Sequence, residues 1–308
     1  MEKKVLKKRL LKAARRDKYL YLLFFPVFVY YIVFCYLPIP GVVLAFKEFK
    51  LGSGIYGGSW IGLDNFKLFF SSVYSYRIIR NTILLSVYTL LFGFPIPILF
   101  AVAVTQIRHK NFRRFVQTCS YLPHFISTVV LVGIMKNFFA VDSSGLVNNI
   151  IIKLGGTRIN FFMDPSWFRT LYVGSGIWQG FGFSSIIYIS AIAGIDPSLY
   201  ESAQVDGITK FKEVWYITLP SIIPTIIILF ILQLGRIMSV GFEKVFLMYN
   251  PAMYETSDII STFVYRRGIE NSDYSYSTAV GLFNSLINFT LVFGSNALCR
   301  RLTNTSLW

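Results

Sequence analysis

Six long apolar runs dominate the sequence, and short polar connections separate them. A helix needs about 20 apolar residues to cross about 30 Å of hydrocarbon, because each residue adds about 1.5 Å. Each run is long enough, so we expect an all-α integral membrane protein with six transmembrane helices. The expected spans are residues 19–38, 78–106, 118–140, 169–195, 219–241 and 277–299.

Charge gives these spans an orientation. Basic residues gather before the first run, between the second and third, between the fourth and fifth, and after the sixth. By the positive-inside rule these segments are cytoplasmic, so we expect both termini in the cytoplasm and a multi-pass protein of the cell membrane. The basic residues flank apolar runs and form no aromatic-basic platform, which argues against a nucleic-acid partner despite the net charge of +15. Only 15% of residues are charged, against about 25% in soluble domains.

A polar island, residues 196–218, interrupts the apolar sequence between the fourth and fifth runs. Asp196 can cap a helix and Pro197 fits its first position. Gly207 allows the positive φ of a sharp turn. We therefore expect a short helix, a turn and a second short helix, all exposed to water. One face of the second helix should carry Phe211, Val214, Trp215 and Thr218.

The island carries a family resemblance. Glu201-Ser202-Ala203, Asp206-Gly207 and Ile217-Thr218-Leu219-Pro220 resemble the cytoplasmic EAA loop in permease subunits of binding-protein-dependent ABC importers. Ser202 stands where the family usually has a second alanine. The likeness covers nearly the whole chain and is strongest to the LplB-like oligosaccharide and polysaccharide permeases. It is carried there by Asn81-Thr82, Gln117 through His124, Tyr200 through Gly207, Gly241-Phe242-Glu243 and Tyr249-Asn250-Pro251.

The resemblance implies a type I (MetI-like) importer transmembrane domain whose island is a coupling loop that inserts into a groove on an ATPase subunit. Glu201 and Asp206 would then make polar contacts, Gly207 the turn and Ala203 a close fit. The residues so assigned to coupling are Tyr200, Glu201, Ala203, Asp206, Gly207, Phe211, Leu219 and Pro220. The implied partners are a second permease subunit in a heterodimer, two ATPase subunits, an extracellular solute-binding lipoprotein and an oligosaccharide substrate, besides membrane lipid.

No reaction centre is evident in the sequence. It has no G-x-x-x-x-G-K-[ST], no G-x-S-x-G and no H-E-x-x-H, and it has two histidines and three scattered cysteines. We therefore expect a transport subunit rather than an enzyme, with no catalytic residue, metal site or cofactor of its own. ATP and Mg²⁺ are expected on the partner ATPase.

Polar and small residues within apolar helices are candidates for the substrate path, because they are costly in lipid unless they face a cavity or a partner. In the fourth run, Trp178 or Phe183 could stack on a sugar, Gln179 could bond its hydroxyls, and Gly180 could let it approach the backbone. Gly176 and Gly180 also form G-x-x-x-G, which equally indicates close helix packing. The resemblance places Gly180 and Phe183 at sugar-contacting positions of maltose-type permeases. The fifth run and its end add Gln233, Arg236, Met238 and Ser239.

Other polar residues in the spans have structural interpretations. Arg236 could pair with Glu243 or meet an acidic sugar. We expect His124 to be packed and hydrogen-bonded, and Asn284 and Asn288 to bond neighbouring helices. The segment Gly93 to Pro97 should break or kink the second span.

The chain divides into a basic cytoplasmic segment (1–18), the first helix with its outer loop (19–76), the transmembrane domain (77–300, with coupling loop 196–218) and a cytoplasmic tail (301–308). The main alternative function is an autonomous secondary transporter or channel for a polar solute. Such a transporter should carry carboxylates inside its spans for ion coupling, and the expected spans contain almost none.

Overall fold

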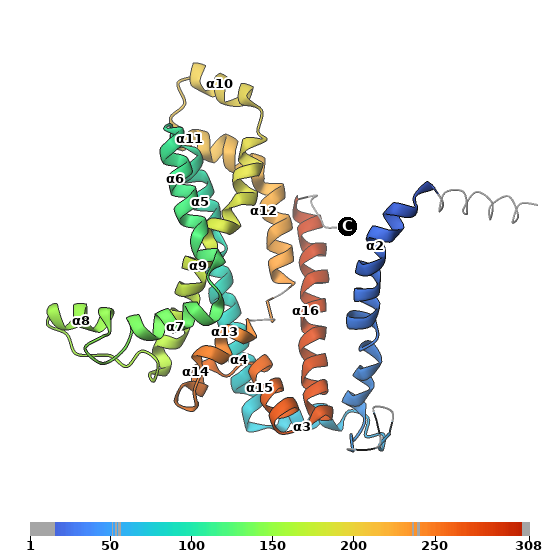
Figure 1. Cartoon of the computed structure of the whole chain (residues 1–308). Helices are drawn as coiled ribbons and strands as arrows, with labels where there is room; N and C mark the ends of the chain where they lie inside the picture. The colour runs from blue at the N-terminus through green and yellow to red at the C-terminus, as the bar shows by residue number, and fades with distance from the viewer. Residues whose placement is uncertain are drawn as a thin grey trace, which may run out of the picture.

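The computed structural model describes residues 16–303 apart from 51, 53, 55, 56, 236, 239 and 240, and the side chains of 302 and 303 also lie outside the description. Long helices stand side by side, and α10 lies at one end of the bundle (Figure 1). The first half contains α2 (Lys18–Tyr31), η1 (Ile32–Tyr36), η2 (Ile39–Phe46), α3 (Asp64–Ser71), α4 (Val73–Tyr88), η3 (Thr89–Gly93), α5 (Pro95–Thr105), α6 (Lys110–Tyr121), η4 (Leu122–Phe125), α7 (Thr128–Phe138) and α8 (Leu146–Lys153). The second half contains α9 (Pro165–Ala193), α10 (Pro197–Val205), α11 (Lys210–Glu213), η5 (Val214–Thr218), α12 (Leu219–Leu234), α13 (Phe242–Met248), η6 (Pro251–Met253), α14 (Tyr254–Ser257), α15 (Ile260–Tyr265), η7 (Arg266–Glu270) and α16 (Tyr274–Thr303).

The all-α prediction is confirmed: extended pairing within the described residues is limited to an isolated bridge between Lys47 and Trp60. Within the part of the chain that the structure describes, five helical stretches are long and apolar enough to cross a membrane, and a bent pair of helices makes a sixth when counted as one span. The described start of α2 and end of α16 lie toward the α10 end of the bundle (Figure 1). That arrangement agrees with both termini and the polar island sharing one side of the membrane. The basic segment before residue 16 lies outside the described residues.

The third span differs from the single helix that we predicted for residues 118–140. Helix α6 begins earlier, and the chain bends by 98° between Lys110–Phe125 and Thr128–Phe138. Pro123 is the second residue of the tight turn η4, and the Ser127 side chain caps α7 by accepting the Val130 N–H at 3.3 Å. The amide of Gln179 donates to the Ile126 carbonyl at 2.7 Å, so a backbone group released by the bend has a partner. Irregular backbone is tolerated inside a membrane when its polar groups have hydrogen-bond partners in the protein.

We predicted a break or a kink in the second span, and of these two the break is absent. The π-helical turn η3 and the turn residue Phe94 precede Pro95, and the stretch Val73–Thr105 remains one candidate span of 33 residues. A π turn shifts the hydrogen-bond register locally, which lets the helix accept prolines that lack an N–H donor. The proline segment therefore causes a local irregularity and not an interruption.

Helix α9 is the centre of the packing, since it contacts α4, α5, α6 and α12. Its tightest approach is at Gly182, where an added Cβ would overlap the backbone of Ser120 in α6. Gly180, two residues earlier, has open space on its Cβ side. The close helix packing suggested by G-x-x-x-G therefore belongs, within this chain, to Gly182 and not to Gly180.

Hydrogen bonds between elements agree in part with the sequence predictions. The Asn288 side-chain oxygen accepts the Met238 N–H at 3.0 Å, so this bond joins α16 to the turn after α12, whereas we predicted a bond to a helix. The side-chain oxygen of Asn284 is buried without a hydrogen-bond partner among the described residues, and the predicted bond of Asn284 to a neighbouring helix stays a prediction.

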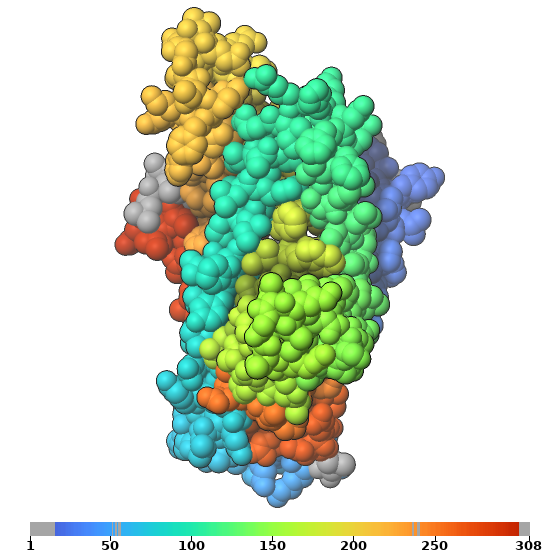
Figure 2. Space-filling model, turned by 90° about the vertical axis from the view of Figure 1, so that its left-hand side faces the viewer, coloured from blue at the N-terminus to red at the C-terminus, as the bar shows by residue number. Residues whose placement is uncertain are grey.

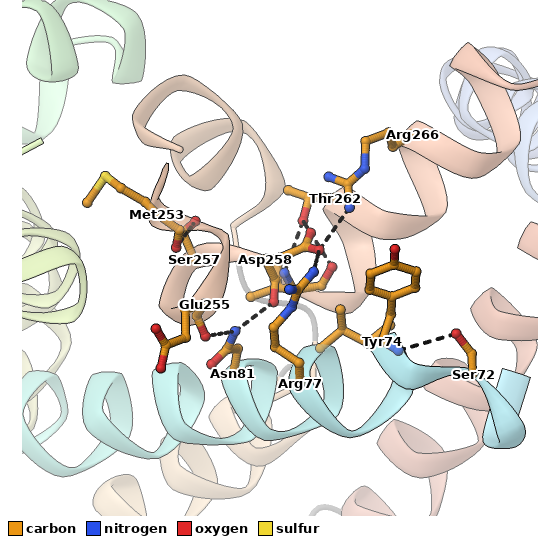
Figure 3. Close-up of polar contacts among 12 residues, drawn as sticks. Ser72, Tyr74, Arg77, Asn81, Met253, Glu255, Ser257, Asp258, Thr262 and Arg266 are labelled. Carbon is orange, nitrogen blue, oxygen red and sulfur yellow. Dashed lines mark hydrogen bonds and ion pairs between the residues drawn. The ribbon is translucent and has the colours of Figure 1, made fainter. Parts of the chain in front are cut away.

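A polar cluster around Asp258 fixes the long loop between α12 and α16 onto the bundle (Figure 3). The Asp258 carboxylate is fully buried and accepts hydrogen bonds from Arg266 at 2.8 Å, Thr262 at 3.0 Å and Arg77 at 3.3 Å. The amide of Asn81 on α4 donates to the Asp258 carbonyl at 3.1 Å. Residues far apart in sequence thereby hold α4 to the segment formed by α14 and α15.

Alanine at Gly182 should loosen the contact between α9 and α6, because its methyl group has no room beside Ser120. Overpacking of this kind costs about 1–3 kcal/mol. We expect Gly182→Ala to lower the thermal unfolding midpoint of the detergent-purified protein. Gly180→Ala is the matched control, since its Cβ points into open space, and an equal midpoint for both variants would contradict the packing described here.

Loss of the Asp258 carboxylate should be costly, because Arg77 and Arg266 would lose their shared partner. Removing one member of a buried ion pair lowers the free energy of unfolding by about 3–5 kcal/mol. Both arginines are partly exposed, so we expect a loss near the lower end of this range. Asp258→Ala should therefore unfold at clearly lower temperature than wild type. The control Asp64→Ala removes an exposed pair with Lys67 and should cost at most about 0.5 kcal/mol. Equal stability of the two variants would show that the cluster does not hold the loop.

Candidate functional site

A cavity of about 760 Å³ lies among α9, the η3–α5 segment, α12 and α13. Figure 2 shows α9 recessed between α4–α5 and α6, with the loop that carries α8 in front. The wall is mostly apolar and aromatic, with a few amide, hydroxyl and amino groups. It is formed by Thr89, Gly93, Phe94, Pro97, Tyr172, Val173, Gly176, Ile177, Gln179, Gly180, Phe181, Phe183, Ser184, Ile186, Ile187, Tyr188, Leu229, Leu232, Gln233 and Lys244. Such a lining fits a ligand with apolar faces and hydroxyl edges.

Four residues predicted for the substrate path meet in this wall: Gln179, Gly180, Phe183 and Gln233. They come from α9 and α12, so the fold brings together positions that are about 50 residues apart in the sequence. Gly180 has no side chain between the cavity and the helix backbone, which is the arrangement that close approach of a ligand requires.

The other predicted path residues lie elsewhere. Trp178 is half exposed and does not line the cavity. Met238 is buried in a separate side-chain cluster with Phe69, Ile78 and Phe263. Arg236 and Ser239 lie outside the described residues, so the suggested pairing of Arg236 with Glu243 stays a prediction.

Two side chains in the wall are already engaged. The Gln179 amide N–H₂ is bonded to the Ile126 carbonyl, so one of its groups stabilises the bend before α7. The Phe183 ring stacks on His124, with ring centroids 4.0 Å apart and 3° between the planes. His124 is thus packed as predicted, through its ring, but the expected hydrogen bond is not among the contacts of the described residues. A sugar that stacks on Phe183 would use the other ring face.

Lys244 is a lining residue that the sequence analysis missed. It is 8% exposed, and its Nζ donates to the Tyr172 carbonyl at 2.8 Å. The same nitrogen lies 4.7 Å from the centroid of the Tyr172 ring. The available signal was the charged pair Glu243-Lys244 in an otherwise apolar stretch. Glu243, which was predicted as a partner for Arg236, is exposed.

The polar island has the predicted helix–turn–helix form. The Asp196 carboxylate caps α10 by accepting the Ser198 N–H at 2.9 Å, and this backbone hydrogen bond, with one from the Ser198 hydroxyl, lowers the pKa of Asp196. Gly207 turns the chain with φ +67°. The Tyr200 hydroxyl bonds the Thr218 hydroxyl at 3.1 Å and so ties α10 to η5. Helix α10 is therefore held to the base of the following span.

The exposed surface of this loop carries both charge and large apolar groups. Glu201 and Asp206 are exposed, as are Val205 (88%) and Phe211 (72%). Ala203 is buried within the loop, Leu219 is partly buried and Pro220 is exposed. Apolar side chains this exposed at the tip of a polar loop are typical of a surface that a partner covers.

The predicted apolar face of the second short helix is divided in the structure. Thr218 is fully buried, whereas Phe211 and Trp215 are exposed and contact each other edge to face, with ring centroids 6.2 Å apart. The reason is the π-helical turn η5, which changes the angular spacing that the prediction assumed.

Comparisons with known proteins agree with this geometry. Residues 69–304 match the family model described as "Binding-protein-dependent transport system inner membrane component". Protein LplB of Bacillus subtilis (strain 168) is 41% identical over 96% of this chain and 93% of the relative. The polygalacturonan/rhamnogalacturonan transport system permease protein YteP of the same organism is 40% identical over 97% of this chain and 93% of that protein.

Two solved structures superpose closely. One is the crystal structure of a bacterial ABC transporter involved in the import of the acidic polysaccharide alginate, with a TM-score of 0.88, 43% identity and coverage of 96% of this chain and 99% of that chain. The other is a bacterial alginate ABC transporter in complex with an alginate pentasaccharide-bound periplasmic protein, with a TM-score of 0.89, 42% identity and coverage of 97% and 100%.

Proposed function

This chain belongs to the family of binding-protein-dependent transport system inner membrane components, and we propose that it is one of two permease subunits in an ATP-driven importer of oligosaccharides. The names of its relatives support a saccharide substrate. The cavity supports it as well, because rings such as Phe183 can stack on apolar sugar faces while Gln179, Ser184 and Gln233 offer polar groups.

The main support for this proposal is that the same two helices, α9 and α12, line the cavity and hold the exposed loop. Helix α9 contributes lining residues between Tyr172 and Tyr188 to the wall, and it ends at Ala193, three residues before the cap of α10. Helix α12 contributes Leu229, Leu232 and Gln233, and it follows directly from α11 and η5. A displacement of the loop is therefore transmitted to both walls of the cavity.

The mechanism that we propose is mechanical. ATP binding would close two ATPase subunits, move α10 and α11 with them, and turn the spans from an inward-open to an outward-open arrangement. Such a movement couples to transport only if ATP and substrate each bind the two arrangements with different affinity. In this account ATP and Mg²⁺ are held by the ATPase subunits.

The partners follow from the exposed surfaces. The loop tip, with Val205 and Phe211, would dock on an ATPase subunit. Helix α2 has no buried residue in the described part of the chain, so lipid or a second permease would cover it. A solute-binding protein outside the cell would deliver the substrate, and the solved complex of a similar transporter with a periplasmic protein supports this partner.

An autonomous secondary transporter has less support. Ion or proton coupling needs an ionisable acid in the path. The described wall of the cavity contains no Asp or Glu.

Gly207→Arg should uncouple the importer. Gly207 has φ +67°, a conformation that costs an L-residue about 1–2 kcal/mol, and its Cβ side is open, so a long cation there would disturb the docking surface and spare the spans. We expect normal membrane insertion but abolished oligosaccharide uptake and abolished stimulation of ATPase activity in proteoliposomes.

Gly155→Arg is the matched control, because Gly155 has φ +85°, equally open surroundings, and a place in the loop after α8. That variant should transport like wild type. Normal uptake by Gly207→Arg would contradict the coupling role of the loop.

A further inference from the structure

Lys244 places a positive charge in the wall of the cavity. Its side chain comes from α13 and is largely buried against α9, where the Tyr172 carbonyl accepts one hydrogen bond at 2.8 Å. The Tyr172 ring lies beneath the ammonium group, at 4.7 Å from its centroid. Both contacts orient the group, and both offer only partial negative charge.

No carboxylate balances this charge in the described part of the chain. Each described salt bridge joins other residues, and the lining residues include no acid. Glu243, its neighbour in sequence, is exposed. An ammonium group removed from water without a full counter-charge is unfavourable, so its retention in a wall calls for a partner that enters the cavity.

The ammonium group also has capacity for such a partner. It has three N–H donors, and the Tyr172 carbonyl occupies one. Gly176 lies alongside, and a Cβ there would stand only 3.3 Å from Nζ. The absence of a side chain at Gly176 keeps the approach from α9 open.

We propose that Lys244 binds a carboxylate of the transported substrate, so that the importer carries acidic oligosaccharides of the uronate type. This inference rests on the proposed function. A carboxylate is favoured over a phosphate or sulfate monoester because one cation balances one carboxylate, whereas a phosphate dianion would bring an excess negative charge into a wall without a second described cation. The aromatic and amide groups around it would hold the rest of each sugar ring.

The retained partners of Lys244 also limit the strength of the ion pair. The Tyr172 carbonyl competes for the ammonium group, so a bound carboxylate can be exchanged when the cavity opens to the other side. Transport needs binding that is strong enough for entry and weak enough for release.

The test uses the complete importer, reconstituted with its own binding protein in proteoliposomes. The probes are trisaccharides from polygalacturonate and alginate, which carry carboxylates, and maltotriose and arabinotriose, which are neutral. We expect wild type to take up a carboxylated probe. Lys244→Gln, which keeps an N–H donor for Tyr172 without the charge, should reduce that uptake about tenfold or more. Lys244→Arg should retain most of it.

Lys153→Gln, on the exposed end of α8, is the matched control and should behave like wild type. Complex assembly should be equal in all variants, which separates a role in substrate binding from a role in folding. Equal uptake by Lys244→Gln and wild type, or equal loss in the Gln and Arg variants, would overturn the inference. Uptake of neutral probes alone would overturn it and leave oligosaccharide import standing, whereas uptake of no probe by wild type would contradict both.

Discussion

The need to satisfy polar groups away from water governs this structure. In hydrocarbon, a backbone or side-chain polar group must find its partner within the protein. The bend before α7 is possible because Gln179 bonds the Ile126 carbonyl, and the loop before α16 is held because Asp258 receives two arginines and a threonine. Lys244 is the informative exception, since its described partners compensate its charge only in part.

Local chemistry in the sequence predicts much of the fold. Apolar runs of sufficient length predict the spans, and Asp196, Pro197 and Gly207 predict the form of the polar island, because caps and turns depend on the residue itself and its near neighbours. The bend of 98° in the third span is a different case. It depends on a hydrogen bond from Gln179, which is 53 residues away from Ile126 and leaves no local signal.

The candidate site was predictable to a similar extent. The pattern of polar, small and aromatic residues in the apolar runs, together with the family resemblance, selected Gln179, Gly180, Phe183 and Gln233, which line the cavity. It could not separate Gly180, which faces open space, from Gly182, which packs against α6, because spacing along one helix does not reveal which neighbour each face meets. Lys244 was missed for the same reason: α13 lies between two spans, and only the tertiary fold turns its lysine toward α9.

We propose that this chain works as the membrane half of an ATP-driven complex. The most direct measurement is affinity purification of the wild-type chain from its native membrane in mild detergent, followed by identification of the proteins that remain bound. We expect a second multi-span permease and an ATPase with a P-loop to remain bound. Recovery of the chain alone, or as a homo-oligomer that moves solute without ATP, would contradict it.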